Sequence, residues 1–592
     1  MRRAFVCAFL LLLALTTPSA WARDPITPLS DIHRGLDCTA LTVIHGTDIS
    51  SFDVQVLDVV ADTDGTGPRI LVHVSGPAVD GTGLAEGFSG SPVYCPDANG
   101  AIGNAGAISA TVGQYGEDVG LVTPIEQMLN LPVTPPSGTV RLPRLLRAAR
   151  PIASPLVLSG LSPSLGDLME QTALTHGRAL IATPAGPLGT FAPQPLVPGA
   201  SMAVALSTGA VAAGAIGTVT YRDGNVVYGF GHPLEGAGRR SLPLQDAYVF
   251  AVIDNPVDAG NTTSYKLAAP GHTVGTLTND ALTGVVGTVG APPRTVPLTV
   301  RVKDLDTGVF VQQRTDIADE IDLGNPDGQS ALSGIASLAV AQAITSAFGG
   351  APAQETGRLC LTAHLRELSK PLRFCDRHVV EGVSLGAQAP ASLALPMASD
   401  VSDALDVFAN ARFRALHVTQ VDATVRMERG ATLATILGAD MARPVVRPGQ
   451  RVRVALRVRV LRGPLRTLRF ALRIPHGIAP GPHLLRLVGT PAEGAGGLGS
   501  GALSILSDLF GGSDSGPPPA AQSMAQAVAG YREAASFDGV RASLGGQVWP
   551  AYLNPQARLD GRASLLVIVA PPSRHRHHAP PRAIGRILAA RG

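Results

Sequence analysis

Charged residues are scarce in this chain. They make up 16% of its 592 positions, and the formal net charge is only +2. Lysine is nearly absent, since it occurs only as Lys266, Lys303 and Lys370. Without a basic excess, the sequence offers no electrostatic case for a nucleic-acid partner. A hydrophobic content of 45%, with 67 glycines and 48 prolines, argues against a disordered chain and favours many short strands and turns around a buried core.

Short metal and cofactor motifs are also missing. The sequence has no C-x-x-C pair and no H-E-x-x-H pattern, and its glycine-rich loops are not followed by a helix carrying a lysine. We therefore expect no cofactor and no metal. The sequence leaves the oligomeric state open.

Long hydrophobic runs are limited to two places. Residues 1–22 combine two arginines, an apolar run and the site Ala20-Trp21-Ala22, which is the pattern of a cleaved signal peptide. The run is too short for an ordinary membrane span, so we predict a periplasmic or secreted protein with no integral span after cleavage. Residues 330–348 are apolar but contain serines, a threonine and a glutamine, which favours a buried helix over a span.

Four cysteines remain once the signal peptide is removed, and an even number in an exported chain suggests two disulfides. Cys360 and Cys375 flank a polar turn between two strand-like runs, so they could pair across a hairpin. Cys38 with Cys95 then follows by elimination. Four free buried thiols are the alternative.

The stretch Gly87-Phe88-Ser89-Gly90-Ser91-Pro92 has the composition of a nucleophile turn. A serine nucleophile needs a sharp turn, backbone N–H groups for the oxyanion and a histidine to take its proton. Glycines permit the sharp turn, and the N–H groups of Gly87 and Ser89 could line an oxyanion hole. Ser89 is the candidate because it holds the centre of the pattern. A glycine turn without catalysis is the alternative reading of this stretch by itself.

The segments around this turn resemble the SpoIVB family of serine peptidases, which has a chymotrypsin-like fold. Residues 87–92 match the family's G-M-S-G-S-P turn, residues 100–107 its glycine-rich strand, and residues 125–129 its I-E-x-M-L segment. The match covers residues 41–130. The resemblance implies a serine endopeptidase that cleaves protein or peptide substrates through an acyl-enzyme, with Ser89 as nucleophile. It also implies a mainly β fold, in which a chymotrypsin-like double β-barrel precedes β-sandwich-like domains with a few helices.

The family's catalytic histidine lies in an A-L-G-H segment that follows a G-I-G-T-L-T strand. Residues 214–233 repeat this layout, which implies His232 as the general base. The histidine half precedes the serine half in the family but follows it here, so the two barrels would be in permuted order. His45 is the weaker choice because it lies in the same half as Ser89, whereas two-barrel peptidases take the histidine from the other barrel.

The family's aspartate position holds Gly76 in this chain. Asp80 lies near that position and Asp246 lies downstream of His232, so either carboxylate could orient the imidazole. A Ser–His dyad oriented by backbone is the other alternative. Losing the carboxylate slows a triad enzyme by several orders of magnitude. A catalytically degenerate binding or scaffold protein on a peptidase fold therefore stays open, as does an enzyme that processes only itself.

These patterns divide the chain into consecutive segments. They are a signal peptide (1–22), a serine-bearing barrel half (23–135), a mixed linker (136–205), a histidine-bearing barrel half (206–295), a β-domain with one long helix (296–395), an antiparallel β-sandwich-like domain (396–492), a Gly/Ser/Pro linker (493–519), a small helix–strand segment (520–570) and a basic, disordered tail (571–592).

Overall fold

The computed structural model describes residues 24–571 apart from the gaps 62–66, 113–117, 137–155, 176–179, 184–190, 256–263, 324–330, 350–353, 382–392, 491–519, 534–537 and 555. The predicted signal peptide, the whole of the predicted linker 493–519 and the tail from 572 onward lie outside the described residues. The described part is mainly β, which confirms the predicted class. It divides into two compact units, residues 1–430 with 493–536, and residues 431–492 with 537–592.

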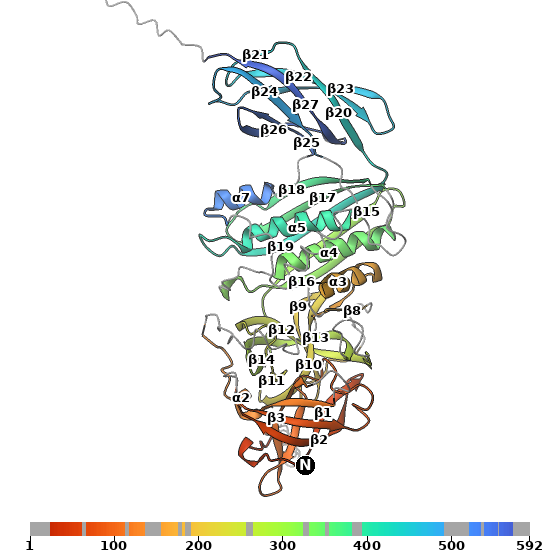
Figure 1. The fold of residues 1–592 in the computed structure, drawn as a ribbon, viewed down its shortest axis with the longest axis vertical. Coiled ribbons are helices and arrows are strands. Elements are labelled where there is room, and N and C mark those ends of the chain that lie inside the picture. Colours follow the sequence, from red (N-terminus) through yellow and green to blue (C-terminus); the bar gives the residue numbers. More distant parts are fainter. Residues whose placement is uncertain are drawn as a thin grey trace, which may run out of the picture. The chain divides into compact units, whose positions relative to one another are not determined.

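The first six strands form a closed barrel, drawn in red and orange in Figure 1. Its strand order is β1-β2-β3-β6-β5-β4. Side chains alternate along these strands between the interior and the surface, so that Phe52, Val54 and Val56 on β2 pack inside with Ile70 and Val72 on β3. The strands are β1 (Asp37–His45), β2 (Asp48–Val60), β3 (Arg69–Ser75), β4 (Pro92–Pro96), β5 (Ile102–Thr111) and β6 (Val119–Pro124).

A second set of six strands also pairs in a closed ring. Neighbours in the order β9-β12-β13-β14-β11-β10 are hydrogen-bonded, and β10 pairs with β9 to close the circuit. Met202, Val204, Val219, Leu242 and Leu277 fill its interior. The strands are β9 (Ser201–Gly209), β10 (Ala212–Asp223), β11 (Val226–Gly229), β12 (Gly238–Ile253), β13 (Tyr265–Ala281) and β14 (Gly284–Val289). This ring is part of a larger, 13-stranded sheet.

The two rings share one strand order. Numbered within each ring, the strands run first, second, third, sixth, fifth, fourth in both cases. The connection between the third and fourth strands is β3–β4 in the barrel and β11–β12 in the ring. Ser89 lies in the former and His232 in the latter, so the two predicted catalytic residues occupy equivalent connections.

The rest of the 13-stranded sheet extends from both sides of this ring. Helices α4 and α5 lie side by side on one of its faces (Figure 1), where their apolar residues share a core with β15, β17 and β19. The strands are β7 (Leu156–Ser159), β8 (Leu180–Thr183), β15 (Thr295–Asp304), β16 (Phe310–Ala318), β17 (Gln354–Leu365), β18 (Leu372–Glu381) and β19 (Val418–Arg429). The helical elements of this unit are η1 (Leu29–Asp31), α2 (Ile125–Leu129), α3 (Pro163–Thr175), η2 (Ile321–Leu323), α4 (Ala331–Phe348), α5 (Ala394–Ala409) and α7 (Met524–Glu533).

Helix α4 is the apolar run for which a buried helix was predicted. It is long and apolar enough to cross a membrane by composition, but 89% of it is buried inside the unit. The prediction of a packed helix is confirmed. Its apolar surface packs on α5 and the sheet, because residues such as Ile335, Leu338 and Ile344 are fully buried there.

The second unit contains an eight-stranded sheet in the order β23-β22-β20-β27-β24-β25-β26, with β21 paired to β27. Arginines alternate with buried valines and leucines along β22, as predicted for a half-exposed antiparallel sheet. The strands are β20 (Leu433–Met441), β21 (Val445–Val446), β22 (Arg451–Val460), β23 (Leu465–Arg473), β24 (Gly481–Val488), β25 (Gly539–Leu544), β26 (Gln547–Leu553) and β27 (Arg558–Val569).

Two predicted divisions differ from these units. The predicted boundary at 395/396 falls at 430/431 in the structure, because β19 pairs parallel with β15 and antiparallel with β17. The predicted segment 520–570 is also split. Helix α7 packs on α5 in the first unit, whereas β25, β26 and β27 belong to the second.

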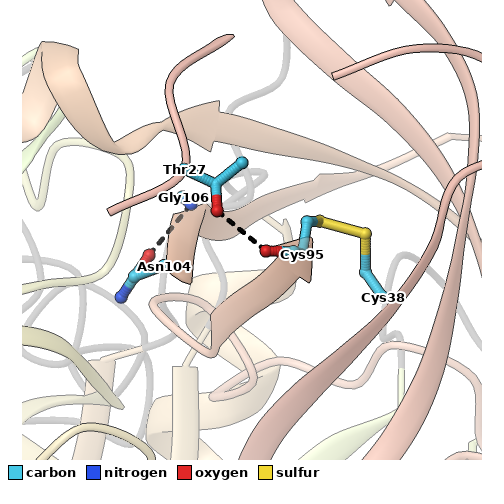
Figure 2. The surroundings of a disulfide bond; sticks show 5 residues. All are labelled: Thr27, Cys38, Cys95, Asn104 and Gly106. Carbon is cyan, nitrogen blue, oxygen red and sulfur yellow. Dashed lines mark hydrogen bonds between the residues drawn. A yellow bond between two sulfur atoms is a disulfide. The ribbon is translucent and has the colours of Figure 1, made fainter. Parts of the chain in front are cut away.

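Both predicted disulfides are present. Cys360 and Cys375 face each other across the β17–β18 hairpin. Cys38–Cys95 joins β1 to β4, where the barrel closes, and Thr27 Oγ1 donates a hydrogen bond to the Cys95 carbonyl at 2.8 Å (Figure 2). Two such bonds fit an oxidising, extracellular type of environment.

Removing Cys38–Cys95 should destabilise the protein more than removing Cys360–Cys375. The separations along the chain are 57 and 15 residues, and the entropy of a closed loop grows with its length. The difference in free energy of unfolding is expected to be about 1 kcal/mol. Urea unfolding of the two Cys→Ser double variants measures it, and equal midpoints would contradict the expectation.

Candidate functional site

The Ser89 turn lies in the connection between β3 and β4. Gly87 and Gly90 have φ angles of +92° and +91°, a region that side chains disfavour and glycine tolerates. The Ser91 N–H donates to the Phe88 carbonyl at 2.9 Å, which closes the turn around Ser89. Glycine is therefore required on both sides of the serine, as the sequence pattern predicts.

Strand β10 of the second ring holds this turn by donating hydrogen bonds to the carbonyl groups of the turn. The Thr218 N–H donates to the Ser89 carbonyl at 2.8 Å, and Thr218 Oγ1 donates to the Gly87 carbonyl at 3.0 Å. Thr220 Oγ1 donates to the Gly90 carbonyl at 2.7 Å. Among the described residues, no backbone or side-chain acceptor takes the N–H of Gly87 or Ser89. Those are the two N–H groups predicted to form the oxyanion hole.

The His232 segment, Gly229-Phe230-Gly231-His232, is held by the first barrel in turn. Thr123 Oγ1, at the end of β6, donates to the Gly231 carbonyl at 2.7 Å. Phe230 has a φ of 66°, one of two positive values among the described non-glycine residues. Such a conformation in a bulky residue is strained and persists only where its surroundings impose it.

The two segments are in direct contact. A Cβ atom placed on Gly90 would lie 2.5 Å from the Phe230 backbone nitrogen, and one placed on Gly231 would lie 2.9 Å from the Ala107 Cβ. Ser89 and His232 are only 4% and 6% exposed. Neither Ser89 Oγ nor His232 Nε2 has a hydrogen-bond partner among the described residues. The structure thus brings the two segments together, without a hydrogen bond between the two reactive atoms.

His232 is held in the tautomer that a general base requires. Its Nδ1 lies 2.7 Å from the Pro233 carbonyl, which can only accept a hydrogen bond. Nδ1 therefore carries the proton, and Nε2 is left as the basic nitrogen. Burial lowers the pKa of His232 to about 4, so the ring is neutral at pH 7.

The structure brings neither candidate aspartate to His232. Asp80 Oδ1 accepts a hydrogen bond from the Gly76 N–H at 3.0 Å, within its own turn. Asp246 is fully buried and accepts from the N–H groups of Gln194 and His272, with His272 Nδ1 3.1 Å from its Oδ2. Among the described residues, only the Pro233 carbonyl forms a hydrogen bond with the His232 ring, and the Phe230 ring lies beside it with its centroid 5.9 Å away. Asp246 instead orders the start of the segment around Gln194.

Lys266 is a third polar residue at this site, which sequence motifs did not single out. Its side chain is 2% exposed, and its alkyl carbons would lie 3.1 Å from a Cβ atom on Gly87. The ammonium lies 4.8 Å from the centre of the Phe88 ring and 2.7 and 3.3 Å from the hydroxyl oxygens of Thr42 and Thr218. Burial lowers the pKa of Lys266 to about 7. Its rarity as one of three lysines was the only signal in the sequence.

No protein family and no curated protein matches this chain. The resemblance to the SpoIVB family therefore rests on the sequence motifs alone.

A hollow of about 470 Å³ lies over β17, β18 and β19, away from the Ser89 turn in sequence. It is lined by Arg358, Arg373, Arg426 and the Cys360–Cys375 disulfide. Neither Ser89 nor His232 lines this hollow.

Replacing Gly90 with alanine should disrupt the contact between the two segments. The new Cβ would lie 2.0 Å from the Thr218 carbonyl oxygen, and the backbone there cannot yield without displacing β10. Gly81→Ala is the matched control, because Gly81 has a φ of +89° and open space around its Cβ position. Thermal unfolding should show Gly90→Ala less stable than the control by about 1–3 kcal/mol, the usual cost of overpacking. Equal stability of the two variants would show that the contact does not matter.

Proposed function

We propose that this protein is an exported serine endopeptidase, similar to the SpoIVB family, in which Ser89 is the nucleophile and His232 the general base. The observation that supports this most directly is the meeting of two equivalent connections, one from each six-stranded ring, with Ser89 on one and His232 on the other. On this proposal the barrel and the ring are the two halves of a chymotrypsin-like double barrel in permuted order.

The proposed reaction follows from the tautomer and the free backbone groups. His232 Nε2 takes the proton of Ser89 Oγ as that oxygen attacks the scissile carbonyl. The oxyanion is stabilised by the N–H groups of Gly87 and Ser89, and the protonated imidazole then protonates the leaving amine. Water hydrolyses the acyl-enzyme by the same steps. A small rotation of the Ser89 or His232 side chain is required to form their hydrogen bond.

The Pro233 carbonyl takes the place of an aspartate in this proposal. It orients the imidazole but carries no full charge, so it stabilises the imidazolium less than a carboxylate would. Lys266 is then a positioning residue. It packs against Gly87 and Phe88 and is linked through the Thr218 hydroxyl to the Gly87 carbonyl, which sets the orientation of the turn.

A second candidate is a binding or scaffold protein on a degenerate peptidase fold. Two observations favour it: the reactive atoms of Ser89 and His232 are buried, and no carboxylate among the described residues contacts His232. In that case the contact between the two segments serves only to join the two rings. A third candidate is an enzyme that cuts only its own chain. It differs from the other two because it would be active for one cleavage of itself and inactive afterwards.

Labelling with a fluorophosphonate probe separates these candidates. The mature wild-type protein should be labelled, Ser89→Ala should not, and His232→Gln should react at least about 100-fold more slowly, the smallest usual effect of losing a general base. Ser91→Ala is the matched control, because the Ser91 hydroxyl is as buried and as unpartnered as that of Ser89. A folded wild-type protein that stays unlabelled, or labelling that depends on Ser91, would exclude Ser89 as nucleophile.

The rate of fluorophosphonate labelling should depend on pH through the ionisation of two groups, His232 and Lys266. The rate should rise through pH about 4, where His232 loses its proton, instead of near 6.5 as for a solvated histidine. It should fall again near pH 7, because Lys266 loses the positive charge that lies beside the Phe88 ring and the Thr218 hydroxyl, next to the turn that carries Ser89. Lys266→Met should remove only the upper limb. An acidic limb near 6.5 in the wild type would argue against a buried His232 as the base.

A further inference from the structure

Three side chains of the kinds that bind metal ions meet between strand β18 and helix α5, about 290 residues or more after Ser89 in the sequence. Asp376 and His378 are two residues apart on β18, so both point to the same face of the sheet. Helix α5 covers that face, since a Cβ atom on Gly357, the β17 partner of His378, would lie 2.5 Å from Met397 Cε. Asp400 follows Met397 by about one helical turn and completes the group.

The ligand atoms of these residues are close together and shielded from water. His378 Nε2 lies 2.8 Å from Asp400 Oδ2 and 3.4 Å from Asp376 Oδ2, and the three ligand atoms all lie within 4.8 Å of one another. Asp376, His378 and Asp400 are 0%, 2% and 7% exposed. Two carboxylates and one imidazole nitrogen thus point to a common centre inside the protein.

A simple ion pair accounts poorly for this arrangement. A single Nε2–H can be donated to one carboxylate, yet both carboxylates approach the same nitrogen. The formal charge of the triad is −2 with a neutral ring and −1 with a charged one, and a buried group of this charge attracts a cation. His417 shows the ordinary alternative in the same unit, because its two nitrogens each face a different carboxylate, Glu367 and Asp322, at 2.6 Å.

The geometry points to a divalent metal site formed by Asp376, His378 and Asp400, with zinc as the ion that fits best. A neutral His378 would offer Nε2 as ligand, and the two carboxylates would balance the charge of the ion. Zinc bonds of about 2.1 Å in a tetrahedral arrangement separate the ligand atoms by roughly 3.4 Å. His378 Nε2 lies at 3.4 Å from Asp376 Oδ2 and at 2.8 Å from Asp400 Oδ2, so a small outward shift of Asp400 would admit the ion. Calcium is a poorer fit because it takes six to eight oxygen ligands and does not favour imidazole.

The ion would join α5 to β18. Two of the ligands come from the strand and one from the helix, and they are separated along the chain by the gap 382–392. Ligands spread over positions 376, 378 and 400 match no short metal motif, so the sequence alone indicated no metal. The site does not depend on the proposed peptidase activity.

Zinc binding by the mature protein tests this inference. The protein is treated with a chelator, dialysed and titrated with Zn²⁺ alone in a calorimeter, with His575, His577 and His578 changed to glutamine so that the tail cannot contribute. One equivalent should bind, and His378→Gln and Asp400→Asn should each weaken binding by more than about 100-fold, beyond the loss typical of groups outside the ligand shell. His417→Gln, which removes the other histidine between two carboxylates, should leave the affinity unchanged.

Titration with Co²⁺ provides a readout that needs no ligand variant. A tetrahedral site with nitrogen and oxygen ligands gives strong visible absorption, which Zn²⁺ should abolish at one equivalent. Failure of the folded wild-type protein to bind Zn²⁺ would overturn the inference. Binding that persists in both His378→Gln and Asp400→Asn would overturn it as well, because the ion would then lie elsewhere.

Discussion

The reciprocal support of two short connections is the constraint on which the candidate site depends. The turn that carries Ser89 belongs to the first barrel, but Thr218 and Thr220 of the second ring bind its carbonyls. The segment that carries His232 belongs to the second ring, but Thr123 of the first barrel binds the Gly231 carbonyl. Each half therefore supports the connection that belongs to the other. The positive φ of Phe230 is consistent with a backbone held by both halves.

Few titratable side chains lie at the contact between these two segments, as expected in a chain that contains few charged residues. His232 and Lys266 are both buried, and burial lowers the pKa of each. Hydroxyls, a carbonyl and an aromatic face surround them, so hydrogen bonding replaces ion pairing as the means of orienting the two side chains. Such an arrangement keeps the imidazole neutral, with Nε2 unprotonated, at every pH above about 4. It also gives up the stabilisation of the imidazolium that a carboxylate would add.

Elsewhere in the first unit, covalent and polar links join elements that the chain separates. Cys38–Cys95 fixes β1 to β4 directly after the Ser89 turn, and Cys360–Cys375 fixes the β17–β18 hairpin. Asp376, His378 and Asp400 link that same hairpin to α5. The sheet that continues from the second ring is thus attached to its covering helix by polar groups as well as by the shared apolar core.

The sequence by itself determined the features that depend on neighbouring residues. Alternating apolar residues indicated the strands, the composition of residues 330–348 indicated a buried helix, and glycine spacing indicated the turn around Ser89. The hairpin around Cys360 and Cys375 was local enough to predict one disulfide, and the other followed by elimination. Each of these features leaves a pattern within a few turns or strand lengths of chain.

Only the tertiary structure decided which distant segments meet. The common strand order of the two rings depends on pairing between strands that are not neighbours in sequence. The pairing of β19 with β15, which moves the unit boundary to residue 430, and the position of Lys266 beside Gly87 join residues more than 100 positions apart. The same holds for the failure of Asp80 and Asp246 to reach His232. Strand pairing and burial between remote segments follow from how the whole chain packs, and they leave no periodic signal in the sequence.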